Sequence, residues 1–246
     1  ESALVFNTGY MTNLGVLYGL LQTGDVVFSD ELNHASIIDG CRISRCKVVV
    51  YKHNDMADLQ RLLETEIVTG QRFIVTDGVF SMDGDIADLP SLAVLKKQFN
   101  AFLIVDDAHG VGVIGNDGSG TASHYGLTDV IDLQVGTLSK ALAAEGGYVA
   151  GKKILIDYLI NRSRPFIFST ALAPATLAAA NAALLLLQTQ ASKYLDSLRA
   201  NSRLMRRLLL EGGLNVVEGI TPIIPVVIGE AGLTMQFADR LKSKGI

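Results

Sequence analysis

The chain has 246 residues, and its 21 lysines and arginines against 25 aspartates and glutamates give a formal net charge of −4. Hydrophobic residues make up 49% of the sequence and charged residues 19%, which favours a globular protein with a large core over a disordered chain. The mild acidity argues against nucleic acid as a partner, and no apolar stretch reaches the ~18 residues that a membrane span needs. Cys41 and Cys46 are too few for a disulfide framework or a zinc site, so we expect no metal and a reducing, cytoplasmic setting.

Strand-forming runs alternate with helical patterns over the first two-thirds of the chain. Short β-branched runs predict strands over residues 25–28, 47–51, 72–76, 102–106, 132–135 and 147–150. Helical patterns predict helices over residues 12–21, 35–44, 55–64, 89–99 and 152–161. This alternation, with strands that are apolar throughout, predicts an α/β fold with a mostly parallel sheet covered by helices. Ligands bind such sheets at the carboxyl ends of the strands, so functional residues are expected just after each strand.

The last third of the sequence is mostly helical. A long helix is predicted over residues 175–210, with a bend or break near residues 189–192 and the pair Gly212-Gly213 as its stop. Its apolar stretch over residues 178–187 is expected to be a buried helix face. Residues 221–228 are predicted as an edge strand because two prolines interrupt the run.

We expect the chain to be a piece of a longer protein, because it begins with Glu1 and its last predicted helix, over residues 235–246, stops without a following element. The composition and the predicted elements suggest three parts. These are a large domain over residues 1–174, a connecting helical region over 175–213, and the beginning of a smaller domain over 214–246.

The strongest chemical signal is the segment Val105-Asp106-Asp107-Ala108-His109-Gly110, in which an apolar strand runs directly into two acids and a histidine. Strand alternation places Asp106 and Asp107 on opposite faces of the sheet. A carboxylate at a strand end can hold a proton on a heterocycle or bind a metal. The ordinary alternative is a capped strand end with solvated acids. It would explain the two aspartates, but not the nearby histidine.

A second signal is Gly136-Thr137-Leu138-Ser139-Lys140, where hydroxyl residues and one lysine follow a predicted strand. Hydroxyls and exposed amides suit a phosphate, and a lysine in a partly desolvated site can form a Schiff base. A surface lysine at the start of a helix is the ordinary alternative. The spacing does not match the Gly-x-x-x-x-Gly-Lys-Ser/Thr loop of nucleotide-binding proteins.

Four further segments are weak when each is taken alone. Gly9-Tyr10 lies in a polar turn that opens a helix, where backbone N–H groups attract anions and where a plain N-cap is the ordinary alternative. His34 follows a strand and could pack on a flat cofactor or act in acid–base chemistry. Ser81 lies in an Asp- and Gly-rich loop that lacks the ligand spacing of a calcium site. Ser169 and Thr170 close an apolar run and could equally cap the long helix.

In this order and at these spacings, the six segments resemble the α-oxoamine synthases, which are pyridoxal 5'-phosphate (PLP) enzymes that join an amino acid to an acyl-CoA with loss of carbon dioxide. The resemblance covers the chain from Gly9 to the proline-containing run near residue 225. It implies fold type I of the PLP-dependent transferases, which is aspartate-aminotransferase-like, followed by the start of a smaller C-terminal α+β domain. It also implies amino-acid and acyl-CoA substrates and a homodimer with a shared active site.

The resemblance also implies roles for particular residues. Lys140 is similar to the lysine that forms the Schiff base, and Asp106 to the aspartate that pairs with the pyridine nitrogen. His109 is similar to the histidine that hydrogen-bonds the phenolic oxygen of the cofactor, and His34 to the residue stacked on the ring. The remaining positions match cofactor contacts of the family, the last two of them in the partner subunit: Gly9, Tyr10, Ser81, Thr137, Ser169 and Thr170.

The chain departs from the family pattern in two respects. Family members usually carry a glycine shortly after the Lys-Ala pair, where this chain has Ala143. The family arginine that binds the substrate carboxylate, and an N-terminal segment that helps to close the acyl-CoA site, are expected outside residues 1–246. No single residue decides between alanine and glycine as the amino acid, which differ by one methyl group.

Three other interpretations remain open from the residues alone. The chain could be a non-catalytic partner subunit of the same fold, although it retains Lys140, Asp106 and His109. It could be another fold relative, such as an aldolase or an aminotransferase. A nucleotide-binding module is the third, but no Gly-x-Gly-x-x-Gly opens a helix after the first strand.

Overall fold

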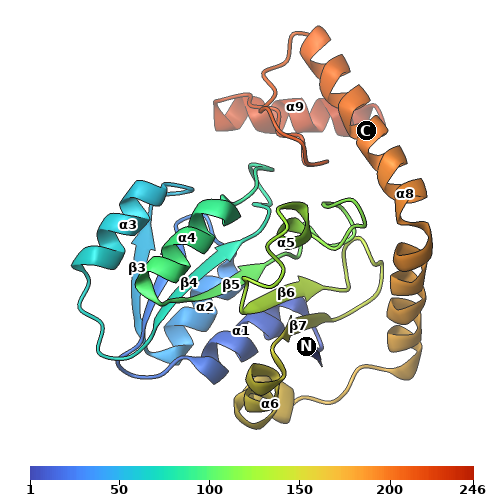
Figure 1. Ribbon diagram of the computed structural model, residues 1–246. Helices are drawn as coiled ribbons and strands as arrows, with labels where there is room; N and C mark the ends of the chain where they lie inside the picture. The colour runs from blue at the N-terminus through green and yellow to red at the C-terminus, as the bar shows by residue number, and fades with distance from the viewer.

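A seven-stranded sheet forms the centre of the molecule in the computed structural model, which describes residues 1–246 (Figure 1). The strand order is β1-β7-β6-β5-β4-β2-β3. Strands β2 to β6 pair in parallel, whereas β7 pairs antiparallel with both β6 and β1. The strands are β1 (Ser2–Phe6), β2 (Val26–Asp30), β3 (Lys47–Tyr51), β4 (Arg72–Asp77), β5 (Phe102–Asp106), β6 (Leu133–Thr137) and β7 (Gly147–Gly151).

Nine helices accompany the sheet. They are α1 (Gly9–Leu20), α2 (Ala35–Ser44), α3 (Met56–Thr65), α4 (Leu89–Phe99), α5 (Thr121–His124), α6 (Lys153–Arg162), α7 (Arg164–Ile167), α8 (Pro174–Glu211) and α9 (Ala231–Ser243). Helix α8 runs along one side of the sheet domain and leads to the segment that carries α9 (Figure 1). No helix is both long enough and apolar enough to cross a membrane.

Two hydrophobic cores cover the two faces of the sheet. One core contains Leu59 of α3, Leu92 of α4 and Leu103 of β5, and the other contains Val16 of α1, Ile37 of α2 and Ile104 of β5. Each such side chain contributes about 1.5–3 kcal/mol when it is fully buried. The neighbours Leu103 and Ile104 belong to different cores, so the predicted alternation along this strand is confirmed, together with the predicted mostly parallel α/β sheet.

The structure contains elements that the sequence does not predict, and one helix has different bounds. The first strand, Ser2–Phe6, was not predicted; it pairs antiparallel with β7 and buries only Leu4 and Phe6. The short helices α5 and α7, with four residues each, are too short for a periodic pattern. The last helix begins earlier than predicted, at Ala231, and ends at Ser243.

The predicted strand over residues 221–228 is wrong, because that segment forms only an isolated bridge between Val216 and Val226. Pro222 and Pro225 have no N–H group to donate to a ladder. The guanidinium of Arg206 also donates to the backbone carbonyls of this segment, so these groups do not face a second strand. The acceptors are the carbonyl oxygens of Val217, Thr221 and Ile223.

Helix α8 is interrupted where a bend was predicted, since Gln190 has φ −137° and ψ 22°. Its apolar stretch is not buried as expected. The side chains of Leu184, Leu185 and Leu186 are 38%, 52% and 44% exposed in this chain. The division of the sequence at residues 174 and 213 stays a prediction; helix α8 begins at Pro174.

Candidate active site

A cavity of about 250 Å³ lies at the carboxyl ends of β4, β5 and β6 and beside the first turn of α1. Parallel pairing brings these ends together, because Asp77 is in register with Asp106, and Asp106 with Val135. The cavity is lined mainly by polar side chains. The lining residues are Thr8, Gly9, Tyr10, Asn13, His34, Ser36, Asp77, Ser81, Asp106, Ala108, His109, Thr137, Ser139 and Lys140.

Asp106 is a buried carboxylate that has no ion pair with a lysine or arginine. Its Oδ2 accepts from Asn13 Nδ2 at 2.5 Å and its Oδ1 from the Ala108 N–H at 3.0 Å. Burial raises the pKa of Asp106, while these two donors and the nearby Lys140 oppose the rise. Burial and the charge of Asp106 also raise the pKa of Asp77 well above its usual range. A positively charged or N–H-bearing group placed in the cavity would therefore be stabilised by both acids.

Asp107 points to the opposite face of the sheet and does not line the cavity. Its carboxylate accepts from the Thr121 N–H at 2.6 Å and from the Thr121 hydroxyl at 3.0 Å. A Cβ atom on Gly110 or on Gly120 would lie 1.9 Å from one of its oxygens, so only glycine fits there. Burial raises the pKa of Asp107 to about 7. The two adjacent acids thus have separate roles, and Asp107 anchors the loop between β5 and α5.

Lys140 and His109 face the same cavity from the ends of β6 and β5. Partial burial lowers the pKa of Lys140, although the carboxylates of Asp106 and Asp77 act in the opposite direction. Burial, followed by the charges of Lys140 and His34, lowers the pKa of His109 to about 4. His109 is therefore neutral near pH 7, with one ring nitrogen able to donate and the other able to accept a hydrogen bond.

The first turn of α1 forms the other wall of the cavity. The Thr8 hydroxyl caps this helix by accepting from the Met11 N–H at 3.1 Å. A Cβ atom on Gly147 would lie 2.7 Å from Gly9 Cα, so the helix start packs directly on β7. The Thr137 hydroxyl lies 2.8 Å from that of Ser139 in the same cavity. Free N–H groups of a helix start beside two hydroxyls suit a phosphate group.

His34 lies at the mouth of the cavity with an exposed ring whose orientation is fixed by its neighbours. Its Nδ1 is 2.7 Å from the Ser36 hydroxyl, and its backbone N–H donates to Asp77 Oδ2 at 2.8 Å. Asn13 Nδ2 also donates to the Ser36 hydroxyl, at 2.8 Å. Tyr10 and the exposed Ser81 complete this rim, and the Tyr10 hydroxyl donates to Asp39 at 2.6 Å.

Ser169 and Thr170 do not line the cavity of their own chain. They do not cap the long helix either, because α8 begins at Pro174 without a side-chain cap. The Thr170 carbonyl instead accepts from Asn7 Nδ2 at 2.8 Å, which holds this segment near the turn before α1. Every other predicted site residue lies in the cavity.

Sequence reasoning assigned no role to Asn13 or Asp77, although both lie within segments that it singled out. Asp77 could have been found as an acid that ends a strand neighbouring β5. Asn13 could not, because its role depends on the contact between α1 and β5. No three histidine, cysteine, aspartate or glutamate side chains converge as metal ligands.

The turn after Lys140 contains a strained residue, since Ala143 has a φ of +49° where family members usually carry glycine. Left-handed backbone costs a non-glycine residue about 1 kcal/mol. We expect Ala143→Gly to leave the free energy of unfolding unchanged or to raise it by up to ~1 kcal/mol. Urea unfolding of the cofactor-free protein measures the change. Ala141→Gly is the matched control, because Ala141 lacks a positive φ and should lose stability. An equal loss in the free energy of unfolding of both variants would contradict backbone strain at Ala143.

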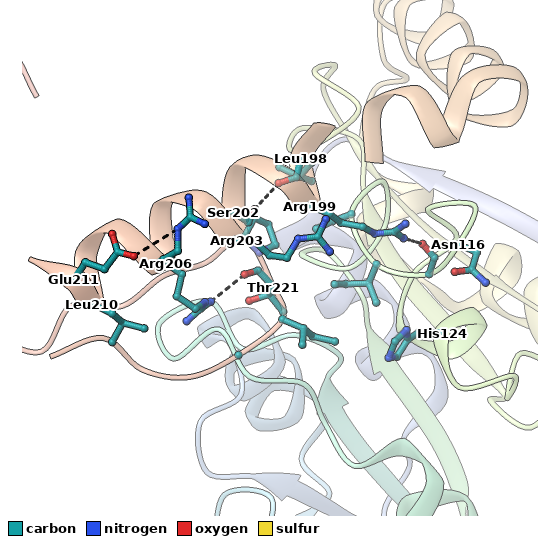
Figure 2. A pocket seen from close by; sticks show the side chains of 17 residues that line it. Asn116, His124, Leu198, Arg199, Ser202, Arg203, Arg206, Leu210, Glu211 and Thr221 are labelled. Atoms are coloured by element: carbon teal, nitrogen blue, oxygen red, sulfur yellow. Dashed lines mark hydrogen bonds and ion pairs between the residues drawn. The ribbon is translucent and has the colours of Figure 1, made fainter. Parts of the chain in front are cut away.

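A larger cavity, of about 620 Å³, lies elsewhere, between the C-terminal half of α8, the loop before α5 and residues 219–222 (Figure 2). Two of its arginines bind backbone carbonyls of neighbouring segments. Arg199 donates to the Gly115 carbonyl at 2.5 Å, and Arg206 donates to the carbonyl of Thr221 at 3.2 Å. This cavity anchors the C-terminal segment and contains neither Lys140 nor a pair of buried acids.

Comparison with known proteins places this fold and cavity in a family. The family model "Aminotransferase class I and II" matches residues 1–246. The chain is 49% identical to 8-amino-7-oxononanoate synthase of Lysinibacillus sphaericus and 52% identical to that of Geotalea daltonii, in each case over 100% of this chain and 63% of the relative. The chain therefore spans about 63% of the length of these relatives.

Solved structures give the same result. A serine palmitoyltransferase from S. paucimobilis with bound PLP and myriocin matches with a TM-score of 0.90 and 33% identity, over 94% of this chain and 60% of that one. An 8-amino-7-oxononanoate synthase from Francisella tularensis matches with a TM-score of 0.84 and 32% identity, over 98% and 70%. This chain belongs to the aminotransferase class I and II family and, within it, to the α-oxoamine synthases. Its fold is that of the PLP-dependent transferases of fold type I, as expected.

Proposed function

We propose that the protein is a PLP-dependent acyltransferase that condenses L-alanine with a pimeloyl thioester, as in biotin synthesis. The observation that carries the proposal is the single cavity in which Lys140, Asp106, His109 and His34 meet. The identity of about 50% to 8-amino-7-oxononanoate synthases supports this pair of substrates. In the overall reaction the amino-acid α-carbon gives up its proton and bonds to the thioester carbon, the sulfur leaves as a thiol, the carboxylate departs as carbon dioxide, and a proton takes its place on the α-carbon.

The residues of the cavity suit PLP group by group. The unpaired buried carboxylate of Asp106 would hold a proton on the pyridine nitrogen, and His109 would hydrogen-bond the phenolic oxygen. His34 would pack against the ring. Gly9 and Tyr10, at the start of α1, would meet the phosphate. Thr137 and Ser81 would supply further polar contacts.

When bound, PLP would supply an electron sink for the negative charge formed at the α-carbon of the amino acid. The protein has to move the proton. Lys140 Nζ would bond the cofactor covalently in the resting enzyme and, once released by substrate, would take the α-proton. Its lowered pKa favours the neutral amine that this step needs.

We also propose a homodimer in which Ser169 and Thr170 reach the phosphate in the partner's site. Two observations support this arrangement. Neither residue lines the cavity of its own chain. The leucines of α8 over residues 184–186 are exposed and provide an apolar surface for a partner. The two free cysteines fit a cytoplasmic location.

The proposed activity is tested with the full-length protein loaded with PLP. Alanine and glycine are each offered with pimeloyl-CoA and with acetyl-CoA, and release of free thiol and of carbon dioxide is followed. We expect turnover to be highest with alanine and pimeloyl-CoA. Preference for glycine and acetyl-CoA would assign the protein to glycine C-acetyltransferase activity instead. Absence of thiol release from every pair would contradict acyl transfer and support a non-catalytic subunit.

A further inference from the structure

His53, which the reaction above does not use, lies between two carboxylates. It follows β3, and its ring Nδ1 is 2.9 Å from Asp30 Oδ1 while its Nε2 is 2.9 Å from Asp85 Oδ2. The side chain is 22% exposed, and its ring packs edge-on against Phe80 with the centroids 4.4 Å apart. Both ring nitrogens are therefore engaged, in a partly buried position.

This geometry determines which form of the ring fits. Ionised carboxylates only accept hydrogen bonds, so a ring nitrogen that faces one has to donate. A neutral imidazole has a single N–H, whereas the imidazolium has two. The protonated ring, with one positive charge between two negative ones, satisfies both contacts of His53.

The two carboxylates belong to two different loops that lead to the cavity. Asp30 ends β2 and begins the loop to His34, and its Oδ1 also accepts from the Leu32 N–H at 2.9 Å. Asp85 lies in the loop between β4 and α4, and its carbonyl accepts from the Phe80 N–H at 3.0 Å, one residue before Ser81. His34 and Ser81 both line the cavity.

We propose that His53 is a positioning residue that, as an imidazolium, clamps the loop carrying His34 to the loop carrying Ser81 and so sets the geometry of the cofactor cavity. The proposal rests on the proposed function only for the identity of the ligand. Asn54 reinforces the clamp, because its N–H donates to Asp30 at 3.0 Å and its side-chain amide to Asp85 at 2.8 Å.

The charges around His53 favour its protonated form. Burial acts to lower the pKa of His53, but the hydrogen bonds and charges of Asp30 and Asp85 outweigh it, so the pKa lies above its ordinary value. Two further acids are nearby, since Glu31 accepts from the His53 backbone N–H at 2.8 Å and Asp88 donates its own N–H to Asn54. Lys52 is the one neighbouring cation along the chain.

The raised pKa of His53 determines how the stability of this region depends on pH. A histidine with a raised pKa stabilises the fold fully at pH values below its ordinary pKa of ~6.5, and this contribution is lost as the pH rises through the folded-state pKa. The clamp should therefore be closed below pH ~6.5 and should open as the pH rises through the raised pKa of His53.

The experiment uses the full-length protein without cofactor, with ¹⁵N-labelled histidine. Nuclear magnetic resonance gives the protonation of each ring, and hydrogen–deuterium exchange reports on residues 30–34 and 78–87. We expect both ring nitrogens of His53 to carry protons at pH 6, and the protection factors of both loops, which correct for the intrinsic rise of exchange with pH, to fall as His53 titrates. A His53 ring that is neutral at pH 6 would overturn the proposal. Neither measurement needs acyl transfer, so failure here is distinct from failure of the proposed activity.

Variants test the link to the cavity, with PLP itself as the probe. We expect His53→Gln to raise the Kd of PLP at pH 6 about tenfold, the effect of losing roughly one charged hydrogen bond, and to remove the step in Kd at higher pH. His124→Gln is the matched control, because His124 is exposed and lines the other cavity. An unchanged Kd and unchanged loop exchange in His53→Gln would contradict the clamp.

A second variant covers the case in which His53→Gln does not fold. Asp85→Asn keeps the histidine and weakens one arm of the clamp only. We expect the pKa of His53 to fall and exchange to accelerate in residues 78–87, with residues 30–34 protected as before. An unchanged pKa of His53, or unchanged exchange in residues 78–87, would contradict the clamp.

Discussion

Lys140→Ala is expected to abolish the covalent attachment of PLP and to lower turnover by roughly 10³-fold or more, because the same amine serves as the anchor and as the base. The side chain faces a cavity that also holds Asp106 and Asp77, and no other lysine lines it. The fold should survive, since Lys140 makes no ion pair and its side chain faces the cavity rather than a hydrophobic core. Turnover and the absorption of bound cofactor measure the two effects.

Borohydride reduction of the loaded enzyme followed by peptide mapping tests the assignment directly. The label is expected on Lys140 alone. Lys153→Ala serves as the control, because Lys153 pairs with Asp157 at 2.8 Å on the surface of α6 and should retain full activity. Label on another lysine would show that the anchor has been misplaced.

Asp106→Asn is expected to lower turnover by roughly 10²-fold or more, because only a carboxylate keeps the pyridine nitrogen protonated. Stability should fall as well, since the amide replaces an acceptor of Asn13 Nδ2 or of the Ala108 N–H. The neighbouring Asp107→Asn should differ from it in turnover. It removes a buried acceptor of the Thr121 N–H or hydroxyl, so we expect a loss of about 1–3 kcal/mol in the free energy of unfolding, with cofactor binding retained.

The two variants are compared by turnover per bound PLP and by urea unfolding. The comparison is sharp because the two acids are adjacent in sequence and equally well buried, at 6% and 2% exposure. Similar losses of turnover in both variants would contradict the separation of roles by strand alternation.

The parallel strands and their helices could be predicted because the local sequence of each has a recognisable pattern of apolar and polar residues. The strands at Lys47–Tyr51 and Phe102–Asp106 and the helices at Ala35–Ser44 and Leu89–Phe99 have the predicted bounds. Their apolar runs are uninterrupted and end in polar turns, so local pattern and tertiary environment agree. The interruption of α8 at Gln190 falls within the predicted bend over residues 189–192.

The errors arose where distant contacts decide the structure. The first strand depends on pairing with β7, about 145 residues away along the chain, for which no local signal exists. Residues 221–228 have the pattern of a strand, but Arg206 binds carbonyls of this segment. In the cavity, the acids and the lysine follow their strands as predicted, but the contact of Asn13 with Asp106 requires the packing of α1 on the sheet.

The register that places Asp77 beside Asp106 carries a consequence for attempts to improve this protein. Two buried acids that face one cavity repel each other, and the rest of the fold has to tolerate that repulsion. Neutralising either acid would relieve it, so laboratory selection for heat resistance alone would enrich substitutions at these two positions. Such selection would gain thermal stability and lose catalytic activity. A screen for more stable variants should therefore keep both acids unchanged.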